Sequence, residues 1–206
     1  MRTINALGAR ALARLWRRMT LPRRCRFLPH VKTASVARCS PDELVLRQFA
    51  GDRCLRLDLF MRVLLLDETR DGGADGRRLY ERYRVLRPTS DKSATVFLQL
   101  LDDVRRNGFD DDQPVTVARD GSVTDGAHRL ACAIHLDLPD IAVRMVALEH
   151  AFYAVPAPWF LGHGFDRDDV ARLEATAAWY RRRALARTPP SEAAQRLSRR
   201  IGSMSV

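Results

Sequence analysis

The stretch around residues 114–124 constrains the fold most, because two strand patterns are joined there by an unmistakable turn. Residues 114–118 alternate in the manner of a short apolar strand. Residues 119–122 supply glycine and small polar side chains, which favour a tight turn. Val123 and Thr124 then carry the chain back as a second short strand. The sequence therefore predicts a β-hairpin here.

A helix is expected directly after this hairpin, from Asp125 to about Leu136. Asp125 is a residue that caps helices well, and apolar residues then recur at helical spacing at Ala127, Leu130, Ala131 and Ile134. Residues 138–140 end the helix, and residues 141–148 read as another strand. A strand–turn–strand–helix–strand order predicts an α+β fold, with a small mixed sheet and helices around it.

The start of the expected helix suits a phosphate group. A helix entered straight from a strand leaves backbone N–H groups pointing outward at the positive end of the helix dipole. Gly126 lets a ligand approach the backbone, while His128 and Arg129 supply donors and charge.

Charge is distributed unevenly along the chain, whose formal net charge is +10. The first 41 residues contain 10 Lys or Arg and no acidic residue. Seven arginines follow residue 180, against one glutamate, whereas residues 42–180 hold 18 basic and 24 acidic residues. The mildly acidic middle argues against a nucleic-acid-binding core. The basic ends suit contact with an anionic membrane or a nucleic acid.

The remaining composition indicates a cytoplasmic protein. The four cysteines form no C-x-x-C pair, so free thiols in a reducing compartment are the simplest interpretation. The longest apolar run, at residues 63–66, is far too short to span a bilayer, and no secretory signal is evident. Residues 6–19 form an amphipathic, arginine-rich helix pattern. It suits peripheral membrane binding, a targeting peptide or packing on the domain.

Three segments are expected: a basic helix and linker at 1–41, one domain at 42–187 and a basic flexible tail at 188–206. Within the domain, residues 43–68 are rich in leucine, and their alternation leaves strand and helix both open. Helices are expected at 93–106 and from Asp166 toward Arg187. The aromatic segment at 156–165 is expected to be irregular.

The run from Phe109 to Val146 resembles the core of the ParB/sulfiredoxin-like superfamily. The resemblance rests on Gly-Phe, Pro-Val-x-Val and Asp-Gly-Ala-His-Arg-Leu, the last at residues 125–130, and on the strand–turn–helix context. It implies that the glycine-led helix start binds nucleotide phosphates. It covers roughly 40 residues.

Three branches of that superfamily differ at this motif. Sulfiredoxins need a nucleophilic cysteine where Ala127 stands, so their chemistry is absent. Chromosome-partitioning ParB proteins carry Gly-Glu-Arg-Arg, which only Gly126 and Arg129 match, and no helix-turn-helix pattern follows. The form found here is most similar to free-serine kinases and to ParB-like proteins of bacterial polysaccharide gene sets. The kinase branch has a catalytic carboxylate upstream of the motif, which cannot be aligned in this chain.

The resemblance implies roles for individual residues. Asp125 and His128 are the candidate catalytic residues, while the nucleotide contacts are assigned to Gly126, Ala127, His128 and Arg129. Plainer interpretations stand beside these: Asp125 as a helix cap, His128 bonded to a strand carbonyl and Arg129 as an ordinary helix arginine. No metal site is assigned, because His128, Cys132 and His135 lie on one helix, which rarely supplies three zinc ligands.

The function expected from the sequence is that of a nucleotide-binding phosphotransferase acting on a hydroxyl group of a small metabolite or sugar. Its cofactors would be ATP, ADP or CTP with Mg²⁺, and its partners the nucleotide and the small-molecule acceptor. The alternative is a non-enzymatic, nucleotide-gated regulatory module whose basic tails bind DNA or a membrane. The oligomeric state is left open.

Overall fold

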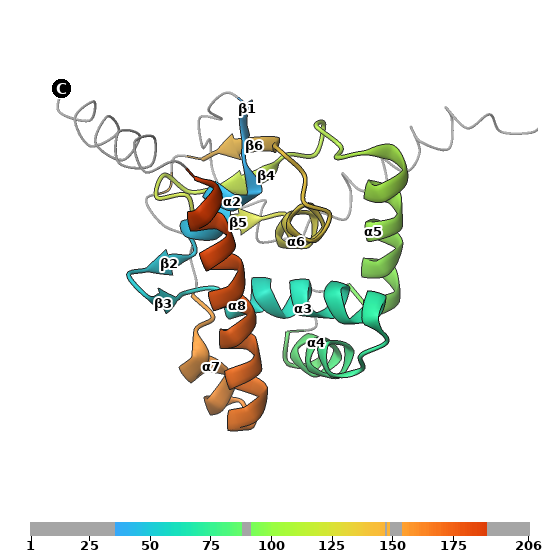
Figure 1. Ribbon diagram of the computed structural model, residues 1–206, viewed down its shortest axis with the longest axis vertical. Helices are drawn as coiled ribbons and strands as arrows, with labels where there is room; N and C mark the ends of the chain where they lie inside the picture. Colours follow the sequence, from blue (N-terminus) through green and yellow to red (C-terminus); the bar gives the residue numbers. More distant parts are fainter. Residues whose placement is uncertain (1–35, 88–91, 147, 149–153, 189–206) are drawn as a thin grey trace, which may run out of the picture.

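A computed structural model of the protein describes residues 36–87, 92–146, 148 and 154–188. These residues form a mixed α+β fold in which helices surround a small sheet (Figure 1). Along the chain, its elements are β1 (Val36–Cys39), α2 (Pro41–Leu46), β2 (Phe49–Ala50), β3 (Arg53–Cys54), α3 (Leu57–Asp71), α4 (Asp75–Leu86), α5 (Ala94–Asn107), β4 (Val115–Val117), β5 (Val123–Asp125), α6 (Ala127–His135), β6 (Ile141–Met145), α7 (Ala157–Gly162) and α8 (Arg167–Arg187).

The larger sheet has the strand order β1-β6-β4-β5. β4 and β5 form the expected antiparallel hairpin, while α6 crosses over so that β6 returns parallel to β4. In the turn, Asp120 accepts a hydrogen bond from the Ser122 amide at 2.8 Å, and Gly121 has a φ of 84°. The predicted order of strand, turn, strand, helix and strand is confirmed.

The sheet also includes a strand that the sequence analysis placed in the linker. Residues 36–39 form β1, which pairs antiparallel with β6, so that Val36 lies opposite Arg144. The side chains of β1 are largely exposed, because it is an edge strand, and this exposure explains its weak apolar pattern. The sheet therefore begins before position 42. The helix pattern at 6–19 and the tail from 189 onward lie outside the described residues.

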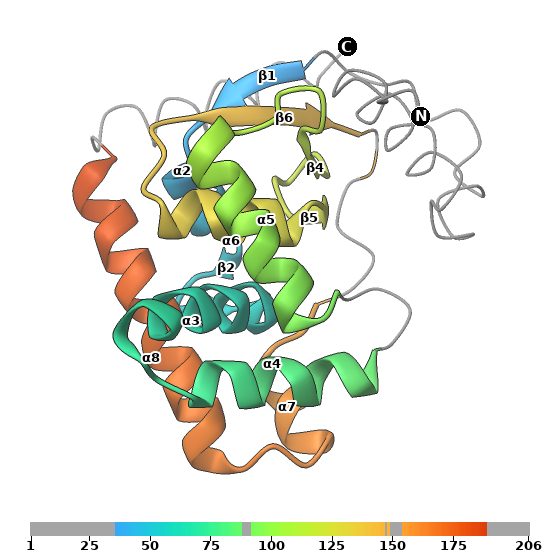
Figure 2. The ribbon, with the colours of Figure 1, turned by 90° about the vertical axis from the view of Figure 1, so that its right-hand side faces the viewer.

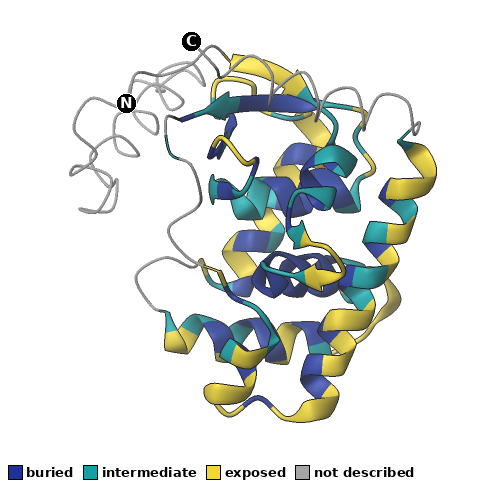
Figure 3. Cartoon of the chain, turned by 90° about the vertical axis from the view of Figure 1, so that its left-hand side faces the viewer, coloured by how far each residue is buried: buried dark blue, intermediate teal, exposed yellow. Residues whose placement is uncertain are grey.

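The leucine-rich segment forms the central helix of the fold. All ten residues from Leu57 to Leu66 are buried, so α3 is covered on every side and shows no clear amphipathic pattern. It packs on α4, α6 and α8, with α5 and α8 on opposite flanks and α6 between α3 and the sheet (Figures 1 and 2). Figure 3 shows this helix as the buried centre of the molecule. The ambiguity at Leu55, Leu57 and Leu59 is resolved in favour of a helix from Leu57.

Both predicted helices are present. The second begins at its expected cap, whereas the first is capped by Ser93 rather than by Ser90 or Asp91, the caps expected from the sequence. The Ser93 hydroxyl accepts from the Val96 amide at the start of α5, and the Asp166 carboxylate accepts from the Asp169 amide at the start of α8. The segment at 156–165 was expected to be irregular, which is wrong. It contains α7, in which Phe160 is buried against Tyr83 and Phe165.

Among the described residues, no helix combines the length and the apolarity needed to cross a bilayer. Cys39, Cys54 and Cys132 are free thiols, as expected, while Cys25 lies outside the described residues.

Candidate functional site

The turn from β5 into α6 differs from the prediction in the residue at the N-cap position of the helix. Asp125 is the last residue of β5, paired with Thr116, and its carboxylate makes no capping bond. Gly126 occupies the N-cap position instead, with a φ of 86°. The prediction that Asp125 caps the helix is wrong, because the turn out of the strand needs a left-handed residue, which glycine adopts readily. The Asp125 side chain is 74% exposed at the start of the helix.

Gly126 is also required by its surroundings. A Cβ atom there would lie 3.1 Å from Nη2 of Arg129 and 3.2 Å from Cα of Val115, which is backbone of the neighbouring strand. The first turn of α6 therefore begins directly against the sheet and without a side-chain cap.

Arg129 holds the start of α6 to the chain entering β4. Its guanidinium donates to the carbonyl oxygens of Gln113 and Pro114, the second at 3.2 Å. Nη2 is also 3.5 Å from the Asp125 carboxylate, a long contact with a mostly exposed partner. Arg129 remains 19% exposed, so it is anchored at one edge and open to solvent at the other.

His128 points away from the sheet, into the space between α3, α4 and α5. Its Nε2 lies 2.8 Å from the Tyr80 hydroxyl and 3.3 Å from Nε of Arg62, and its ring packs edge-on against Phe97. Burial lowers the pKa of His128 well below its usual value, and nearby Arg62, Lys92 and Arg129 lower it further. His128 is therefore neutral at neutral pH. Its side chain thus contacts Tyr80 of α4 and Arg62 of α3.

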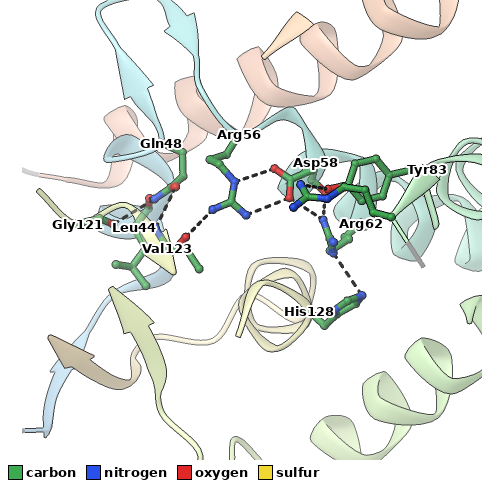
Figure 4. A network of polar contacts seen from close by, with 10 residues as sticks. Leu44, Gln48, Arg56, Asp58, Arg62, Tyr83, Gly121, Val123 and His128 are labelled. Carbon is green, nitrogen blue, oxygen red and sulfur yellow. Dashed lines mark hydrogen bonds and ion pairs between the residues drawn. The ribbon is translucent and has the colours of Figure 1, made fainter. Parts of the chain in front are cut away.

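A buried ionic cluster at the start of α3 lies against His128, above it in the view of Figure 4. Asp58 accepts two hydrogen bonds from Arg56, at 2.8 and 3.0 Å, and one from Arg62 at 3.0 Å. Burial would raise the pKa of Asp58, but Arg56 and Arg62 lower it more, so the carboxyl is ionised. Arg56 also donates to the Val123 carbonyl of β5 at 2.5 Å. Contacts thus run from β5 through Arg56, Asp58 and Arg62 to His128.

The sequence analysis missed this cluster, although the sequence carries a signal for it. Arg56, Asp58 and Arg62 interrupt a leucine-rich run, and in a helix buried on all sides such charges have to pair with one another. Asp58 is also an acidic residue that lies upstream of the motif at residues 125–130, and the fold brings Asp58 toward that motif. Both its oxygens are engaged by arginines, so it acts as a counter-ion.

The three residues considered as zinc ligands point to different neighbours. His128 contacts Tyr80, whereas Nδ1 of His135 lies 2.7 Å from the Asp67 carboxylate. Cys132 is buried, and burial raises its pKa to about 12, which disfavours the thiolate that metals require. In the part of the chain that the structure describes, no cluster of three or more metal-binding side chains occurs.

Several other charged and aromatic residues near His128 and α4 contact protein groups. Arg84 pairs with Glu81, and Nη1 of Arg87 donates to the Tyr83 hydroxyl at 3.2 Å. Trp159 packs edge-on against Tyr83. Lys92 is exposed at the start of α5, where its charge acts on His128.

No protein-family model, curated protein or solved structure matches this chain.

Proposed function

We propose that the start of α6 binds the phosphates of a nucleotide, and that the protein transfers a phosphoryl group to a hydroxyl of a small metabolite or sugar. The observation that carries this proposal is a local excess of positive charge. Arg62, Lys92 and Arg129 come from three different segments and act on His128 in the first turn of a helix that has no side-chain cap, against the one carboxylate of Asp58. A helix N-terminus among cations is a favourable place for a phosphate.

The residues present fit such a ligand. Gly126 leaves the backbone open on a turn where a side chain would be strained, and Arg129 has an exposed edge with which to meet a phosphate oxygen. Asp125 is an exposed carboxylate at the same turn, of the kind that binds Mg²⁺ together with phosphate oxygens. Mg²⁺, when bound, would neutralise charge on the phosphates. In this proposal the domain is a ParB/sulfiredoxin-like core, and ATP, ADP or CTP is the donor.

The reaction follows from positioning and charge. The acceptor hydroxyl oxygen forms a bond to the terminal phosphorus while the bond to the leaving phosphate oxygen breaks, and Asp125 takes the hydroxyl proton. His128 is neutral and held by Tyr80 and Arg62, so we assign it a positioning role on the first turn of α6.

One observation favours a second candidate, a nucleotide-gated regulatory module. Both charged or polar side chains that follow Gly126 are already engaged by protein groups, His128 by Tyr80 and Arg129 by two carbonyls. A bound phosphate would compete for these contacts, which would couple nucleotide binding to the local structure without turnover. The basic termini would then engage DNA or a membrane.

Thermal denaturation with ATP, ADP or CTP, with and without Mg²⁺, tests the binding step. A ligand present at about 100 times its Kd raises stability by roughly 2.7 kcal/mol. We expect stabilisation by at least one nucleotide, and its loss in Gly126→Val, while Gly162→Val serves as the control because its Cβ would meet open space. Absence of stabilisation by every nucleotide would overturn the proposal.

Product formation separates the two candidates. Phosphoryl transfer to any member of a panel of serine-like or sugar acceptors supports the phosphotransferase. Nucleotide binding without turnover for any acceptor supports the regulatory module.

A further inference from the structure

A hollow of about 630 Å³ lies between the β2–β3 hairpin, the start of α7 and the middle of α8. These three elements gather on the flank opposite α5 (Figure 1). The hollow shares no lining residue with the candidate phosphate site, and its volume is within the usual range for small-molecule sites.

The walls of the hollow are tied together by backbone bonds. Val155 donates to the Leu55 carbonyl at 2.8 Å and accepts from the Leu57 amide at 3.0 Å, so Cys54 and Pro156 are held on either side of this junction. A wall fixed in this way is formed before any ligand arrives, which lowers the cost of binding.

The interior offers an apolar surface. Phe49, Pro156, Pro158 and Ala177 line it, and the guanidinium of Arg181 lies 5.3 Å from the centre of the Phe49 ring. Burial raises the pKa of the Cys54 thiol to about 12, so this lining residue is neutral. An aromatic or branched aliphatic group suits these walls.

The charges around the hollow favour an anion. Arg181 is paired with Asp52, at 2.6 Å, which leaves Arg53, Arg182 and Glu174 as the other charged lining residues. Arg53 and Arg182 are exposed, and neither guanidinium group has a hydrogen bond or ion pair with any residue that the structure describes. Two available guanidinium groups against one carboxylate give the lining a net positive charge, and guanidinium groups bind carboxylate, sulfonate and phosphate oxygens well.

We propose that this hollow binds a small organic anion, whose charged group meets Arg53 and Arg182 and whose apolar body lies on Phe49 and the two prolines. This site is separate from the one in the proposed function and does not depend on it. In Gly126→Val, which removes nucleotide binding at α6, binding in the hollow should be unchanged.

The probe for the test is 8-anilinonaphthalene-1-sulfonate, an aromatic anion that becomes fluorescent when it leaves water. The folded protein should bind one equivalent saturably, and the neutral analogue N-phenyl-1-naphthylamine should bind more weakly. Arg182→Glu should weaken binding of the anion at least tenfold, whereas Arg77→Glu, an exposed charge reversal on α4, should not. Absence of saturable binding, or equal binding by these two variants, would overturn the proposal.

A further comparison locates the probe. Ala178→Trp should fill the hollow and block binding, while Ala186→Trp, an exposed alanine on α8 outside the lining, should leave it intact. A variant that loses its circular-dichroism spectrum is set aside, and the Arg182→Glu comparison then decides the outcome. Equal binding by Ala178→Trp and Ala186→Trp would place the probe elsewhere and contradict the proposal.

Discussion

Two aspartate–arginine pairs with the same spacing lie in opposite environments. Asp58 and Arg62 on α3 are almost fully buried, and Arg56 completes their hydrogen bonding. Asp125 and Arg129 at the start of α6 meet at 3.5 Å, with the aspartate largely exposed. Identical four-residue spacing therefore gives a locked structural group in one place and a loose pair, open to exchange with a ligand, in the other. Burial, more than sequence spacing, decides what such a pair does.

The largest expected effect is on the buried pair. Asp58→Ala leaves two buried guanidinium groups without their counter-ion, which should lower the free energy of unfolding by about 3–5 kcal/mol. Asp125→Ala, the matched change at the exposed pair, should cost less than ~1 kcal/mol. Urea denaturation of both variants gives the comparison. Similar losses in the two would mean that the environments are energetically equivalent.

The next effect concerns the loose pair and its ligand. Arg129→Ala removes a charge-assisted bond to phosphate and should weaken nucleotide affinity by ~1.5–3 kcal/mol, or about ten- to a hundredfold. Arg105→Ala, at an exposed arginine of α5, is the control. Titration calorimetry on both variants measures the change. Unchanged affinity in Arg129→Ala would confine this arginine to anchoring the carbonyls of Gln113 and Pro114.

A third prediction uses pH to test His128, which contacts Arg62 of the buried pair and directly precedes Arg129 of the exposed pair. The pKa of His128 is lowered in the folded protein, against 6.5 in the unfolded chain. Below pH 6.5 the unfolded chain therefore binds the proton more readily, and stability falls as the pH decreases from 6.5 toward the folded pKa. The slope should reach at most ~1.4 kcal/mol per pH unit.

His128→Gln should lack this part of the pH dependence, while His163→Gln, at an exposed histidine, should retain it. Denaturation curves recorded at several pH values from about 7 to about 5 measure the pH dependence of stability in both variants. Equal slopes in the two variants would show that His128 exchanges protons freely in the folded state.

The smallest effect on stability is expected for Asp125→Asn. Because this side chain caps nothing and is mostly exposed, the free energy of unfolding should change by less than ~0.5 kcal/mol. In the proposed phosphotransferase the same variant should lose most of its phosphoryl transfer, since asparagine cannot take the hydroxyl proton. Transfer at the normal rate would remove Asp125 from the chemistry.

The hairpin and the helix of the motif could be predicted because their signals are local. The turn residues, the apolar spacing and the glycine all act within a few residues of one another. The helix cap at Asp125 was wrong because pairing with Thr116 across the hairpin extends the strand by one residue and moves the cap to Gly126.

The missed features depend on tertiary contacts. The strand at 36–39 exists because β6 pairs with it, and α7 exists because Phe160 is buried against Tyr83 and Phe165. The cluster around Asp58 requires the knowledge that α3 is covered on all sides, which no single stretch of sequence reveals.

The burial of α3 also has a consequence for biosynthesis. Its covering helices include α8, which ends at Arg187, so more than a hundred residues must follow Leu66 before the last covering helix exists. At a synthesis rate of about 5–20 residues per second, this delay is on the order of ten seconds. During that interval α3, with Asp58 and Arg62 embedded in its apolar part, lacks some of its covering helices. The nascent chain therefore exposes apolar surface that the finished protein covers.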